Sequence, residues 1–83
     1  MAHFPSTILN LAREDRVTVE IEKENGEISE MIATTNPSNM PADKAEKFEE
    51  KHGPSYMVVW SIDRKGFRNI TFANVRAVNG VRV

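Results

Sequence analysis

The chain has 83 residues, of which 40% are hydrophobic and 28% charged, with a formal net charge of −1, so we expect one small soluble domain spanning residues 1–83. It has no cysteine, which excludes a disulfide framework, a cysteine-based zinc site and a thiol nucleophile. No apolar run approaches the roughly 20 residues of a membrane-spanning helix and no signal peptide is recognisable, so we expect a cytoplasmic protein without a membrane partner.

The first predicted element is a short helix over residues 7–13. Ser6 is of the residue type that caps a helix N-terminus. The apolar residues that follow recur at roughly helical spacing and are Ile8, Leu9, Leu11 and Ala12. Because so short a helix is marginal by itself, we expect it to pack against the rest of the domain.

A β-hairpin is predicted next. Residues 16–23, RVTVEIEK, alternate between apolar and polar side chains, which indicates a strand with one buried face. The pair Asn25-Gly26 then gives the strongest hairpin signal in the chain, because both residues tolerate a positive φ. The returning strand covers residues 28–35.

The register of this hairpin has two solutions. A two-residue turn puts Ile32 opposite Val19. A three-residue loop that ends in a bulge at Gly26 puts Met31 opposite Val19 instead. We favour the bulged register, because it buries the small side chain of Ala33.

An insert separates this hairpin from the next strand. Residues 36–41 contain two prolines and are predicted as a loop. Asp43 and Glu46 have the spacing of a capping box, so a helix is predicted over residues 42–52. Phe48 is its only large apolar residue, which indicates a surface helix held by one anchor.

Residues 56–62 are apolar on both faces, which predicts a central and deeply buried strand that contains Trp60. We expect Trp60, Phe72 and Tyr56 in the core. Residues 63–66 suit a type I turn closed by Gly66, and a strand over residues 67–72 follows.

The last part of the chain is predicted to form short strands. Ala73-Asn74 bends the chain, residues 75–78 form a strand, Asn79-Gly80 turns again, and residues 81–83 add an edge strand. The predicted fold is mainly β with short helices. It is a small, strongly bent barrel of about five strands, with an N-terminal helix and a helical insert over residues 42–52 between strands two and three.

The order and spacing of eight short patterns carry a family resemblance. They are Ile8–Leu11, Val17-Thr18-Val19, Asn25-Gly26, Met31 to Thr34, Asn36-Pro37, Val58 to Trp60, Phe67-Arg68 and Val75 to Val78. Over about residues 8–36 and 56–78 the chain resembles the small WYL-like proteins of tailed bacteriophages. The resemblance implies an Sm-like, SH3-like β-barrel and a phage source. The larger WYL domains that this family resembles are regulatory, ligand-sensing modules that contact nucleic acids or nucleotides, which implies such a role for the cations of residues 67–78. The chain departs from the pattern at Thr71, where a second Arg is common, and at Ala73, where Asp is common.

Charge is distributed unevenly along the chain. Residues 1–63 hold all twelve acids and six of the eleven cations, for a formal charge of −6, whereas residues 64–83 hold five cations and no acid, for +5. Cations beside exposed aromatic rings are typical of nucleic-acid surfaces. The candidate nucleic-acid or anion-binding residues are therefore Arg64, Lys65, Phe67, Arg68 and Arg76. The alternative is that these cations only keep exposed strands soluble and unpaired.

Two other kinds of partner remain open. An acidic hairpin face could mimic nucleic acid and bind a host protein, through Glu20, Glu22, Glu24, Glu27 and Glu30. Alternatively, exposed edges at residues 28–35 and 81–83 could mediate self-association.

A catalytic function is not indicated. His3 and His52 have no partner at metal-ligand spacing, and no phosphate-binding glycine loop or nucleophile motif is present. We expect a non-enzymatic protein that needs no metal and no cofactor.

Overall fold

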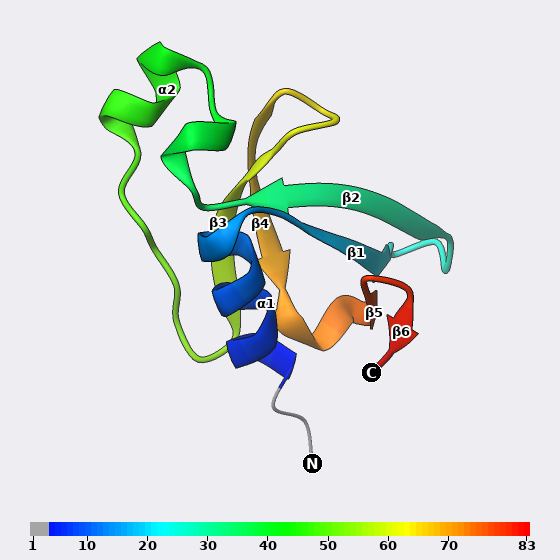
Figure 1. Ribbon diagram of the computed structural model, residues 1–83. Coiled ribbons are helices and arrows are strands. Elements are labelled where there is room, and N and C mark those ends of the chain that lie inside the picture. The colour runs from blue at the N-terminus through cyan, green and yellow to red at the C-terminus, as the bar shows by residue number, and fades with distance from the viewer. Residues whose placement is uncertain (1–3) are drawn as a thin grey trace.

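The computed structural model describes residues 4–83, and they form a bent antiparallel sheet with short helices (Figure 1). The sheet order is β4-β3-β2-β1-β5-β6. The elements are α1 (Phe4–Glu14), β1 (Val17–Glu22), β2 (Ile28–Thr34), η1 (Pro37–Asn39), α2 (Ala42–Lys47), β3 (Tyr56–Ser61), β4 (Gly66–Thr71), η2 (Phe72–Asn74), β5 (Val75–Val78) and β6 (Val81–Arg82). The mainly β prediction is confirmed. No helix within residues 4–83 is long and apolar enough to cross a membrane.

Helix α1 begins earlier than predicted. It starts at Phe4, so Ser6 lies inside its first turn and is not the N-cap. Pro5 is well tolerated in a first turn, because its fixed φ suits a helix and its missing N–H has no helical acceptor there. The ring of Phe4 packs edge-on against Phe72, with centroids 6.4 Å apart, which holds the start of the helix against the sheet.

The bulged register of the β1–β2 hairpin is confirmed. Met31 lies opposite Val19, and Ala33 is fully buried. Gly26 has φ of 85°, and its amide donates to the carbonyl oxygen of Lys23 at 2.9 Å. The positive φ is the conformation that a glycine bulge requires.

The main core lies between α1 and the face of the sheet that it covers. Its buried side chains are Ile8, Ala12, Val17, Val19, Met31, Ala33, Met57, Val59, Ile70, Phe72, Val75 and Val78. Phe72 is in the core as predicted. Trp60 is also buried, at 5% exposed, but it lies outside this cluster, because its neighbour Val59 already occupies the core face of β3. Tyr56 is 38% exposed, so its assignment to the core was wrong.

The insert contains less helix than predicted. Helix α2 ends at Lys47, and its N-cap is Pro41 rather than Asp43. Residues 51–53 instead run along β3: the Val58 amide donates to the Lys51 carbonyl at 2.9 Å, and the Gly53 amide donates to the Tyr56 carbonyl at 2.9 Å. Because β2 pairs with only the end of β3 at Trp60 and Ser61, these bonds satisfy backbone groups that helix formation would leave without partners.

The sheet edges differ in part from the prediction. β6 is an edge strand as expected, with Val81 and Val83 well exposed. β2 is an interior strand, because it pairs with β1 along its length and with β3 at its end. The second edge is β4, which the prediction did not include.

Candidate nucleic-acid interface

The turn between β3 and β4 positions the first candidate cations. It spans residues 62–65, one residue earlier than predicted, and the residue with positive φ is Lys65, at 55°, rather than Gly66. The Asp63 carboxylate accepts hydrogen bonds from the Ser61 hydroxyl at 2.8 Å and from the Ile32 amide at 3.2 Å. These contacts with β2 and β3 hold the turn at residues 62–65.

The pKa of the Asp63 carboxyl is lowered by the net effect of its surroundings. Partial burial of the carboxyl acts in the opposite direction and by itself would raise the pKa. Hydrogen bonds from the Ser61 hydroxyl and the Ile32 amide, with smaller contributions from its own amide and the Arg64 charge, outweigh burial and hold the pKa of Asp63 below its ordinary value. The turn is therefore tied to an ionised carboxylate at neutral pH.

Three of the candidate cations belong to this turn and to the strand after it. Arg64, Lys65 and Arg68 are all exposed. The Arg64 guanidinium donates to the Ser29 hydroxyl, and Arg68 Nη1 donates to the Phe67 carbonyl oxygen at 2.8 Å. Within residues 4–83 none of the three forms a salt bridge with a carboxylate. Their charges are thus available to an external anion.

Phe67 is an exposed ring, as the sequence predicted. It pairs with Trp60, whereas Arg68 pairs with the core residue Val59, so Phe67 and Arg68 project from opposite faces of β4. Phe67 is 39% exposed and packs edge-on against Trp60, with centroids 5.1 Å apart and an interplanar angle of 79°. Phe48 lies nearly parallel to Phe67, with centroids 6.1 Å apart and an angle of 13°. Trp60 therefore supports Phe67 at its edge, while Phe48 partly covers one of its faces.

A pocket of about 160 Å³ lies at these rings, and its lining residues are Lys47, Phe48, Glu49, Lys51, Val58 and Phe67. Sequence reasoning found Phe67 but missed Phe48, Lys47 and Lys51 as site residues. The sequence feature that could have indicated this pocket is Phe48, the only large apolar residue of the predicted helix over residues 42–52. Its contact with Phe67 joins positions 19 residues apart, which periodicity cannot reveal.

Arg76 lies apart from the other candidate cations. It is on β5, which the sheet order separates from β4 by three strands. Its Nε forms a salt bridge with Glu22 at 3.0 Å, and its Nη1 donates to the Ala73 carbonyl at 2.9 Å. Arg76 thus joins β5 to β1 in the fold.

The acidic residues of the β1–β2 hairpin do not form one uniform patch. Glu20 and Glu30 lie directly opposite each other across the two strands. Glu22 is partly neutralised by Arg76. Glu24 and Glu27 lie in the turn around Gly26. The strongest negative charge on the strands is therefore at the Glu20–Glu30 pair.

Of the two histidines, only His52 lies in the part of the chain that the structure describes. His3 lies outside the described residues. His52 is exposed and forms a single β-bridge to Met57 through the backbone. The part of the chain from Phe4 onward contains no cluster of three or more His, Cys, Asp or Glu side chains that could hold a metal ion.

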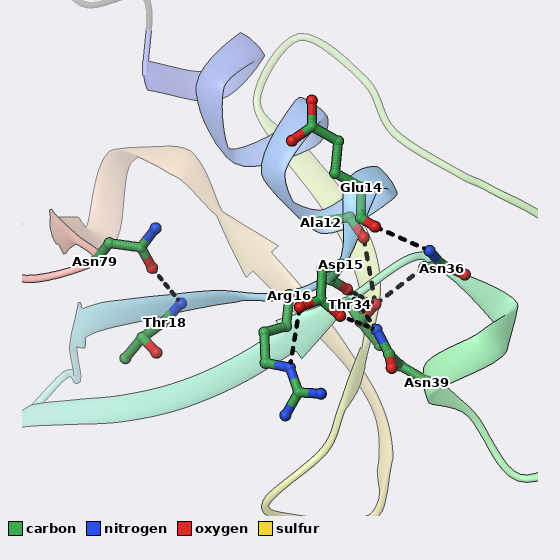
Figure 2. Close-up of polar contacts among 9 residues, drawn as sticks. All are labelled: Ala12, Glu14, Asp15, Arg16, Thr18, Thr34, Asn36, Asn39 and Asn79. Carbon is green, nitrogen blue, oxygen red and sulfur yellow. Dashed lines mark hydrogen bonds and ion pairs between the residues drawn. The ribbon is translucent and has the colours of Figure 1, made fainter.

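The Thr34, Asn36 and Asn39 side chains have a structural role, shown in Figure 2. Thr34 donates to the Ala12 carbonyl at 3.2 Å, Asn36 Nδ2 to the Glu14 carbonyl at 3.1 Å, and Asn39 Nδ2 to the Asp15 carbonyl at 2.8 Å. The carbonyls of Ala12 and Glu14 belong to the last turn of α1, where no N–H of the helix reaches them, and Asp15 follows directly after the helix. The motif around Asn36-Pro37 therefore fastens α1 to the sheet rather than forming a ligand site.

Comparison with known proteins is consistent with this architecture. A search of curated proteins and a search of solved structures each found no match. One family model matches residues 7–76, and its description is WYL_2, Sm-like SH3 beta-barrel fold. The match includes most of α1, the β1–β2 and β3–β4 hairpins and the start of β5, so the barrel fold expected from the resemblance is confirmed. The chain belongs to the WYL_2 family of Sm-like SH3 β-barrels.

Proposed function

We propose that this protein is a non-enzymatic regulatory module that binds single-stranded nucleic acid or a nucleotide at the exposed surface of β4. Its motif order supports a phage-type genome as the source and the host cytoplasm as the place of action. The binding surface consists of Arg64, Lys65, Phe67 and Arg68.

The observation that carries this proposal is an exposed aromatic ring on an edge strand whose cations form no salt bridge within residues 4–83. Phe67 projects from one face of β4 and Arg68 from the other, so a nucleic-acid strand that stacks a base on Phe67 would reach Arg64 and Arg68 with its phosphates around the edge of β4. A base can stack on Phe67, which Trp60 holds in place from its edge. A guanidinium can donate two parallel hydrogen bonds to one phosphate, which favours Arg64 and Arg68 as phosphate ligands.

Other arginines fit this role less well. Arg13 forms a salt bridge with Glu50 at 2.6 Å, and Arg76 forms one with Glu22 at 3.0 Å. An anion that binds there must compete with a carboxylate. The proposed surface therefore excludes Arg76, although the sequence placed it among the candidates.

The test is an NMR titration of labelled protein with single-stranded RNA, single-stranded DNA and a nucleotide mixture, at low and moderate salt. We expect salt-sensitive shifts centred on residues 64–68. The Arg68→Glu variant should lose this binding while it stays folded, because the Arg68 side chain is exposed and its guanidinium donates to the backbone carbonyl of Phe67. Arg82→Glu, with the same charge change on β6, is the matched control. Equal loss in both variants, or binding unaffected by Arg68→Glu, would disprove the placement.

A second candidate function is the binding of a basic host protein through the acidic hairpin face. The observation that favours it is the Glu20–Glu30 pair, because like charges directly opposite each other destabilise a sheet. Glu20→Lys should therefore raise the free energy of unfolding by roughly 0.2–1 kcal/mol. If the face docks a protein, the same variant should lose a host partner that the wild-type protein captures, and Glu24→Lys, in the turn, should lose less.

A further inference from the structure

We propose that the pocket between Phe48 and Phe67 binds a single pyrimidine base, and that Lys47 and Lys51 hold the phosphate of the same nucleotide. This inference rests on the proposed nucleotide or nucleic-acid function and names the ligand class. It adds the insert between β2 and β3 to a surface that the sequence placed at the β3–β4 hairpin and Arg76.

The arrangement of the two rings supports a planar ligand. Phe48 and Phe67 are within 13° of parallel, and their centroids are 6.1 Å apart. A flat ring inserted between two others needs planes about 6.8 Å apart, which is twice the roughly 3.4 Å spacing of stacked bases. If the two rings instead stack directly on each other, this centroid distance requires a large lateral offset, which leaves most of one Phe67 face open. In both cases a base reaches the Phe67 face with a small movement of Phe48.

The pocket is open to solvent on one side, and its size favours a small planar ring. Its volume is about 160 Å³. A cavity of roughly 150 Å³ accommodates benzene, whereas pockets for drug-sized ligands measure roughly 300–1,000 Å³. A single six-membered ring therefore fits better than the two fused rings of a purine.

The polar residues of the pocket match a nucleotide. Lys47 and Lys51 are exposed, and within residues 4–83 neither is in a salt bridge. Glu49 lines the same pocket and supplies an acceptor for the amine of cytosine or the ring N–H of uracil. The pocket thus combines an apolar stacking surface, an acceptor for the base edge and two cations for phosphate.

The segment that carries Phe48 is held on both sides. Before the ring, the Phe48 amide donates to the Ala45 carbonyl at 3.3 Å. After it, Glu50 pairs with Arg13 at 2.6 Å and the Val58 amide donates to the Lys51 carbonyl at 2.9 Å. Because these contacts already order the segment, less conformational entropy is lost when a ligand binds.

The experiment titrates the protein with UMP, CMP, AMP, uridine and inorganic phosphate, and follows Trp60 fluorescence and the aromatic proton shifts of Phe48 and Phe67. We expect UMP and CMP to bind more tightly than AMP, and both uridine and phosphate alone to bind more weakly than UMP. A second titration uses an oligo-uridine strand in place of UMP. The comparison shows whether the pocket prefers a base within a strand or a free nucleotide.

Two variants and two matched controls complete the test. Phe48→Leu keeps an apolar side chain but removes the ring, so affinity for UMP should fall between about 5-fold and about 150-fold. Tyr56→Leu removes an exposed ring outside the pocket, so the affinity for UMP should stay unchanged. Lys51→Gln should weaken the binding of UMP but not that of uridine, which has no phosphate. Lys44→Gln, outside the pocket, should change the binding of neither ligand.

The outcomes separate this inference from the proposed function. If UMP or oligo-uridine binds and Arg68→Glu weakens it while Phe48→Leu does not, the function stands and the pocket assignment is wrong. A preference for AMP over UMP would also overturn the pyrimidine assignment. If no nucleotide and no strand binds at low salt, both the function and the pocket fail.

Discussion

Removal of the Trp60 side chain tests whether the aromatic cluster outside the main core supports the fold. Trp60 is only 5% exposed, and its ring contacts Phe67, which in turn lies against Phe48. Large-to-small substitutions of buried aromatic residues cost roughly 3–5 kcal/mol. Because Phe67 is itself partly exposed and can move into the space, we expect Trp60→Ala to cost about 3 kcal/mol, at the lower end of that range.

The assay is urea denaturation followed by far-UV circular dichroism, since Trp60 is the only tryptophan and its fluorescence is lost in the variant. With an m-value of about 1 kcal/mol/M, the midpoint should fall by about 3 M. Tyr56→Ala is the matched control, because Tyr56 is an aromatic residue on the same strand but is 38% exposed. It should cost about 1 kcal/mol or less. Equal effects in the two variants would refute the view that Trp60 supports the fold.

Three further substitutions test local features of the fold. The folded-state pKa of Asp63 is lowered, so the ionised carboxylate stabilises the fold above the unfolded-state pKa of about 3.9. This stability is lost as the pH falls through the folded-state pKa. Asp63→Asn should therefore flatten the dependence of the urea midpoint on acid pH. Asn36→Ala should cost about 1 kcal/mol in the same assay, and Asn69→Ala, on the exposed face of β4, much less. Gly26→Ala should cost about 1–2 kcal/mol through its positive φ alone, because no atom lies within 4 Å of the added methyl group, and Gly26→Asn should cost less. Equal urea midpoints for Asn36→Ala and Asn69→Ala, or for Gly26→Ala and Gly26→Asn, would contradict these assignments. So would an acid dependence in Asp63→Asn that equals that of the wild-type protein.

The hairpin registers show how far local patterns extend. The alternation in β1 and the Gly26 bulge were enough to place Met31 opposite Val19, because both depend on neighbouring residues and backbone sterics. The turn at Asn79-Gly80 was predicted for the same reason, and both residues have positive φ. By contrast, the β3–β4 turn was displaced by one residue, because the Asp63 carboxylate bonds to the Ile32 amide, 31 positions away.

The candidate site was only partly visible in the sequence. Exposure of Phe67 followed from its place beside a turn, and the cations of residues 64–68 followed from composition. The role of Arg76 could not be predicted from the sequence, because its salt bridge to Glu22 joins positions 54 residues apart. The pocket at Phe48 was missed because a capping-box pattern favoured helix where the chain instead leaves the helix and pairs with β3.

The sequence by itself determined the elements whose energetics are local: the alternating strands, the glycine turns and the apolar face of α1. Tertiary structure alone decided which aromatic residues form a second cluster, which cations are neutralised and where the insert lies. Periodicity reports which face of an element is buried, but not which distant element covers it. Residues 51–53 illustrate the difference, since they pair with β3 only because β2 leaves that edge open.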